Sequence, residues 1–66
     1  MQITINGEQR EVASNITLLE LLESLGITDK VMAAAINMQI VKKEAWKEHH
    51  LVEGDTLELL DFVGGG

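Results

Sequence analysis

The segment from Thr17 to Gly26 constrains the fold more than any other part of the chain. Thr17 and Glu20 fit a capping box, in which the threonine side chain and the glutamate side chain each accept a backbone amide hydrogen bond. Gly26 stands where a left-handed residue often ends a helix. Four leucines recur between these ends at the spacing of one helix face: Leu18, Leu21, Leu22 and Leu25. The segment therefore predicts one amphipathic helix that anchors the core.

Strand-like segments lie on both sides of this helix. Residues 1–5 alternate apolar and polar side chains, and Asn6-Gly7 suits a type I′ turn, so we expect residues 9–12 to complete a hairpin. The alanines of residues 31–36 favour a helix by propensity. That segment is short, follows a complete helix and ends at a turn-like pair, Asn37-Met38, so we predict a buried strand whose small alanines let the helix approach closely.

The C-terminal third predicts one more strand. Residues 42–48 form a charged segment that we expect to be a short helical turn, with Trp46 covering the edge of the core. Glu53-Gly54-Asp55 indicates a turn, and residues 56–62 then read as a strand that is apolar on both faces. Leu60 and Phe62 share the face away from the helix. They form either a docking patch or a surface that a loop or Trp46 covers.

These elements predict an α+β fold of the ubiquitin-like β-grasp type, a mixed four- to five-stranded sheet packed on one main helix. We expect residues 1–63 to be the domain and residues 64–66 to be a flexible glycine tail. Glycine has no side chain to bury, so such a tail is thin enough to thread a narrow channel and deliver a C-terminal carboxylate to another protein. A frayed terminus is the alternative interpretation.

Composition excludes several function classes. A 66-residue chain holds one small core, with no room for a deep cleft, and we find no catalytic constellation in it. The net charge of −6 opposes nucleic-acid binding. Without cysteine, and with only the adjacent pair His49-His50, whose side chains point in different directions, we predict no metal site. No apolar run is long enough for a membrane span, so we expect a soluble cytoplasmic protein that is a monomer when free.

Three segments resemble the ThiS family, the sulfur carriers of thiamine biosynthesis. They are residues 35–46, residues 51–59 and the terminal Gly65-Gly66, and the likeness extends over essentially the whole chain. Two positions differ from the usual pattern: Lys43 stands where the family has arginine, and Gly64 adds a third glycine.

The resemblance implies a carrier and not an enzyme. A ThiF-like adenylyltransferase would join the Gly66 carboxylate to AMP from ATP, and a sulfur donor such as a cysteine desulfurase would convert it to a thiocarboxylate for thiazole synthase. No cofactor would be bound by the chain itself. Gly65 and Gly64 would keep the tail narrow. The residues expected to contact the partners are Leu60, Phe62, Val63, Glu58 and Asp61.

Three alternatives remain open from the residues alone. A sister carrier for molybdopterin or another pathway would have the same fold and tail. A ubiquitin-like protein modifier would form an amide with a lysine. A non-catalytic β-grasp interaction module would need no free C-terminus.

Overall fold

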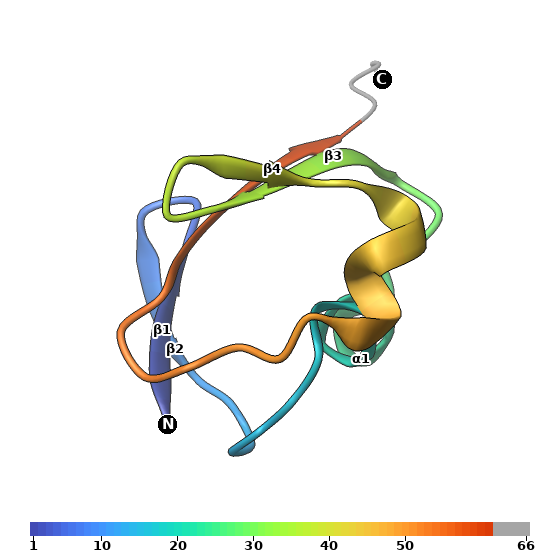
Figure 1. Cartoon of the computed structure of the whole chain (residues 1–66). Helices are drawn as coiled ribbons and strands as arrows, with labels where there is room; N and C mark the ends of the chain where they lie inside the picture. The colour runs from blue at the N-terminus through green and yellow to red at the C-terminus, as the bar shows by residue number, and fades with distance from the viewer. Residues whose placement is uncertain (62–66) are drawn as a thin grey trace.

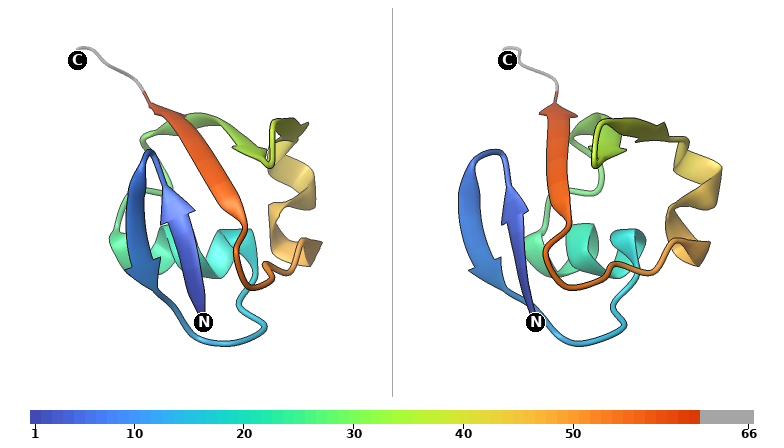
Figure 2. Two further views of the ribbon diagram at one scale, coloured as in Figure 1. Left: turned by 90° about the vertical axis from the view of Figure 1, so that its left-hand side faces the viewer. Right: turned by 60° about the vertical axis from the view of Figure 1, so that its left-hand side comes forward.

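The computed structural model describes residues 1–61, and these form one mixed sheet with one main helix on one side of it (Figures 1 and 2). The predicted positions Phe62, Val63, Gly64, Gly65 and Gly66 lie outside the described residues, so the expected boundary between domain and tail stays a prediction. The strand order is β2-β1-β5-β3-β4. The strands are β1 (Gln2–Ile5), β2 (Glu8–Glu11), β3 (Val31–Ile36), β4 (Gln39–Val41) and β5 (Thr56–Asp61), and the helices are α1 (Leu18–Leu25) and the short 3₁₀ helix η1 (Lys43–Glu48).

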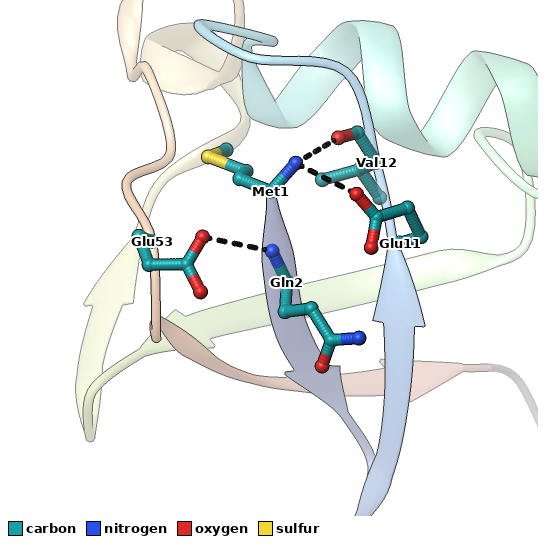
Figure 3. A network of polar contacts seen from close by, with 5 residues as sticks. All are labelled: Met1, Gln2, Glu11, Val12 and Glu53. Carbon is teal, nitrogen blue, oxygen red and sulfur yellow. Dashed lines mark hydrogen bonds and ion pairs between the residues drawn. The ribbon is translucent and has the colours of Figure 1, made fainter.

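The predicted N-terminal hairpin forms, with its second strand at Glu8–Glu11, one residue earlier than the expected residues 9–12. β1 and β2 pair antiparallel with Ile5 opposite Glu8, and Asn6 and Gly7 both adopt the positive φ angles of a type I′ turn, 49° and 87°. Two acids hold the start of the chain (Figure 3). The Met1 ammonium donates to Glu11 Oε2 at 3.1 Å and to the Val12 carbonyl, and the Gln2 amide donates to Glu53.

Helix α1 has the predicted ends. The Thr17 side chain accepts from the Glu20 amide, the Glu20 side chain accepts from the Thr17 amide, and Gly26 has a φ of 71°. Leu18, Leu21 and Leu22 are buried, and Leu25 is half-buried beside them. The capped helix therefore supplies three of the seven largest fully buried side chains.

Residues 31–36 form a strand despite their alanines, because β3 bonds to a neighbour on each edge, β4 and β5. The expectation that this strand is wholly buried was wrong for one face. Val31, Ala34 and Ile36 point into the core, whereas Met32 is 52% exposed. A register shift between Val31 and Ala33 separates these inward positions, so only one alanine, Ala34, is fully buried in the core.

The inner face of the sheet packs against α1 and η1. Trp46 of η1 is buried, and its indole Nε1 donates to the Val41 carbonyl at 2.9 Å, which confirms its predicted place at the edge of the core. Beyond η1, Gly54 takes the positive φ angle that the predicted turn needs, and the chain then enters β5. β5 lies in the middle of the sheet, between β1 and β3.

Candidate docking face and C-terminal strand

Strand β5 alternates between the core and the open face of the sheet. Leu57 is fully buried and lies opposite Ile36, and Leu59 is half-buried opposite Ala34. Leu60 points the other way, opposite Ala33, and is 62% exposed. Of the two interpretations of this position, the covered one is therefore wrong for Leu60, because neither Trp46 nor any loop within residues 1–61 shields it.

The open face carries an apolar hollow of about 460 Å³. The short side chains of Ala33 and Ala35, on β3, lie between larger apolar side chains of the neighbouring strands, Ile40 on β4 and Leu60 on β5. Glu58 and Asn6 also line the hollow. Ile40 is 70% exposed, so apolar surface is available on both sides of the alanines. A groove with small residues between exposed aliphatic ones suits apolar side chains of a protein partner.

The structure brings two of the predicted partner-binding residues together. Glu58 and Leu60 lie on the same open face of β5, two residues apart. Asp61 is the last residue of β5 and pairs with Val31 through the backbone. Sequence reasoning missed the contribution of Ala33, Ala35 and Ile40, because it treated the alanines as helix-facing. The pairing of β3 with β4 was the missing information.

Two asparagines hold β5, and sequence reasoning treated both only as turn residues. On the β3 side, Asn37 Oδ1 accepts from the Thr56 amide and Asn37 Nδ2 donates to Asp55 Oδ1 at 2.9 Å. Asp55 is buried and also accepts from the Val52 amide. On the β1 side, Asn6 bonds through its side chain to Leu59. The positive φ angles of Asn6 and Asn37 were foreseeable from the turns, but their side-chain partners are distant in sequence.

No group of three or more His, Cys, Asp and Glu side chains within residues 1–61 is arranged to hold a metal ion. No helix in that range has the length and apolar character needed to cross a membrane. What the described residues offer is a five-stranded sheet, an apolar groove and a central strand, β5, that ends at Asp61.

The strand order, the single main helix and the terminal glycines define a small ubiquitin-like β-grasp protein. A crystal structure of the thiamine biosynthesis protein ThiS from Geobacter metallireducens superimposes with a TM-score of 0.83, at 31% identity and with all of both chains covered.

The family model of the ThiS family matches residues 3–66. The sulfur carrier protein ThiS of Escherichia coli is 39% identical over the full length of both chains. A thiazole synthase of Paramagnetospirillum magneticum is 36% identical over the whole of this chain, which spans only 20% of that protein. The chain belongs to the ThiS family, the sulfur carriers of thiamine biosynthesis, and members of this family are carrier proteins and not catalysts.

Proposed function

We propose that this chain carries sulfur on the carboxyl group of Gly66 for the thiazole ring of thiamine. The observation that carries the proposal is the match to the ThiS family over residues 3–66, which includes all three terminal glycines. No cysteine is present, so no side-chain thiol competes for this role. The chain itself binds no cofactor in this scheme, and the site of action is the cytoplasm.

The chemistry needs an activating partner. An ionised carboxylate is a poor electrophile, so a ThiF-like adenylyltransferase joins a Gly66 carboxylate oxygen to the α-phosphorus of ATP and pyrophosphate leaves. A sulfur donor, such as the persulfide of a cysteine desulfurase, then attacks the acyl carbon and AMP leaves. Reductive cleavage of the remaining sulfur–sulfur bond by a thiol gives the thiocarboxylate. Thiazole synthase takes the sulfur from it, a pairing supported by relatives in which a thiazole synthase contains a segment similar to this chain.

The open face of the sheet is the docking surface in this proposal. Leu60 and Ile40 are exposed beside the short alanines Ala33 and Ala35, which gives the partner an apolar anchor site. Phe62 and Val63 continue the apolar sequence beyond the described residues, and the acids Glu58 and Asp61 favour a partner whose rim is basic. Gly64 and Gly65 have no side chains, so the tail can enter a narrow active site.

Intact-mass spectrometry tests the proposal. The chain is incubated with ATP, a sulfur donor and a ThiF-like adenylyltransferase, and the expected product is heavier by the replacement of one oxygen by sulfur, located on Gly66. A conjugate of much higher mass would identify a protein modifier. If the mass stays unchanged although the adenylyltransferase is active, the chain is a non-catalytic interaction module. Transfer of the Gly66 sulfur to molybdopterin, and not to the thiazole, would identify the sister pathway.

A Gly66→Ala variant tests whether the sulfur is carried on Gly66. The added methyl group lies beside the reacting carbonyl, so we expect sulfur incorporation to be nearly abolished while the melting curve stays that of the wild type. Adenylation of this variant at the wild-type rate would contradict the role of Gly66.

A further inference from the structure

The hydrogen-bond ladder between β1 and β5 ends at a side chain, that of Asn6. The Thr4 amide donates to the Asp55 carbonyl and the Asn6 amide donates to the Leu57 carbonyl, both at 2.9 Å. These bonds follow the two-residue step of a parallel pair. In a continued ladder, the next bond would run from the Leu59 amide to the backbone carbonyl of residue 6.

The main chain of β1 does not supply that acceptor, because it turns away at Asn6, where φ is 49°. The side chain of Asn6 takes its place. Asn6 Oδ1 accepts from the Leu59 amide at 2.8 Å, and Asn6 Nδ2 donates to the Leu59 carbonyl at 3.4 Å. A side-chain amide carries the same donor and acceptor as a peptide group, so Asn6 adds one more rung to the sheet.

Leu59 is the last described residue of β5 that is held on the β1 side. Leu60 and Asp61 pair with Ala33 and Val31 of β3, across a register shift. The Asn6 side chain is therefore the point within residues 1–61 at which β5 stops being held on both edges. Six residues lie between Leu59 and Gly66.

We propose that Asn6 is a positioning residue for sulfur transfer, which holds the β1 edge of β5 at Leu59 and so sets the direction in which the chain presents Gly66 to the enzymes that act on it. This inference rests on the proposed function. Reaction rates depend steeply on placement, since an error of about 1 Å can lower a rate by up to about 100-fold. Of the apolar residues of the groove, Ala33, Ala35 and Ile40 lie on β3 and β4. Leu60 lies on β5 but stays paired with Ala33 of β3, so we expect loss of the Asn6 contact to alter presentation more than docking.

The exposed position of Asn6 separates this role from a purely structural one. Solvent-exposed hydrogen bonds add little to stability, because water replaces them. Asn6→Gly removes both bonds to Leu59, and glycine accepts the positive φ angle without strain. Asn15→Gly is the matched control, because Asn15 also has a positive φ, 63°, but lies in the loop before α1, away from β5. Asn6→Asp keeps the acceptor for the Leu59 amide and loses the donor to its carbonyl.

The experiment has two readouts. Amide hydrogen exchange by NMR on the free protein should be faster at Leu59 in Asn6→Gly, and unchanged there in Asn15→Gly. Steady-state kinetics of Gly66 thiocarboxylate formation should show kcat lowered about tenfold for Asn6→Gly, with a much smaller change in KM. Asn6→Asp should lie between Asn6→Gly and the wild type in both readouts.

The two readouts distinguish failure of the positioning role from failure of the proposed function. Unchanged exchange at Leu59, a wild-type kcat, or a loss confined to KM would overturn the positioning role, as would an equal loss of kcat in Asn15→Gly. If the wild-type chain gains no sulfur from an active adenylyltransferase, the proposed function itself fails, independently of the exchange measurement.

Discussion

The two faces of the sheet carry similar leucine side chains in different environments, buried on the inner face and exposed on the outer face. On the inner face, Leu57 packs with Ile3 and Ile36 against the leucines of α1 and is wholly removed from water. On the outer face, Leu60 lies beside Ala33 and Ala35 and stays largely exposed. A chain with one helix can cover only one face of its sheet. The apolar surface that remains on the other face is of the kind that marks interaction sites, which fits the docking surface proposed above.

We therefore expect Leu57 to act on stability and Leu60, three positions further along the same strand, to act on partner recognition. Substitutions that remove the same atoms from the two faces test this division directly. Small domains bury only about 60% of their unfolded surface, so each inner residue carries a large share of the stability.

The largest effect is expected on the inner face. Leu57→Ala should lower the free energy of unfolding by about 2–5 kcal/mol, because it leaves a cavity between the sheet and α1. Urea denaturation followed by the fluorescence of Trp46, the single tryptophan, measures this loss. A wild-type midpoint would show that the core relaxes around position 57, and the division between the faces would then be weaker than the burial suggests.

A smaller loss of stability is expected from Asp55→Ala. The buried carboxylate accepts from Asn37 Nδ2 and from the Val52 amide, so its removal leaves two donors without their partner. The expected cost is about 1–3 kcal/mol in the same denaturation experiment. Glu53→Ala, two positions earlier in the same turn, is the control: it removes only a solvent-exposed bond from the Gln2 amide, so it should cost less than about 0.5 kcal/mol. Equal losses in the two variants would mean that Asp55 acts only through the turn.

Leu60→Ala should weaken binding to a partner and leave stability nearly unchanged. The free energy of unfolding should change by less than about 0.5 kcal/mol, because the side chain is already in water. Affinity for a ThiF-like adenylyltransferase, measured by isothermal titration calorimetry, should fall about tenfold, as is typical when one interface anchor is truncated. A large loss of stability with unchanged affinity would place Leu60 in the core and break the comparison.

Sequence reasoning found the inner face more completely than the outer one. The capping box and the leucine spacing of α1 are local signals, and so is the turn at Asn6-Gly7, so the helix and the first hairpin were predictable and are confirmed. The groove depends on which strands lie beside β3, and this is set by pairing between distant segments. For that reason the exposure of Leu60 was left open between two interpretations, and the bonds from Asn6 to Leu59 were not foreseen.

The smallest expected effect concerns charge on the outer face. Glu58 is exposed beside the groove and its side chain has no hydrogen-bond partner within residues 1–61, so Glu58→Gln should leave the free energy of unfolding unchanged. An exposed rim charge acts mainly on association, so the association rate with the adenylyltransferase should fall a few-fold at low salt and converge with the wild-type rate as salt is raised. The control is Glu23→Gln, which removes the same charge on the solvent side of α1, far from the groove. Glu20→Gln is unsuitable, because Glu20 belongs to the capping box. Stopped-flow mixing of both variants over a salt series separates the two cases: an equal slowing in each would mean that net charge, and not the position of Glu58 on the docking face, guides the encounter.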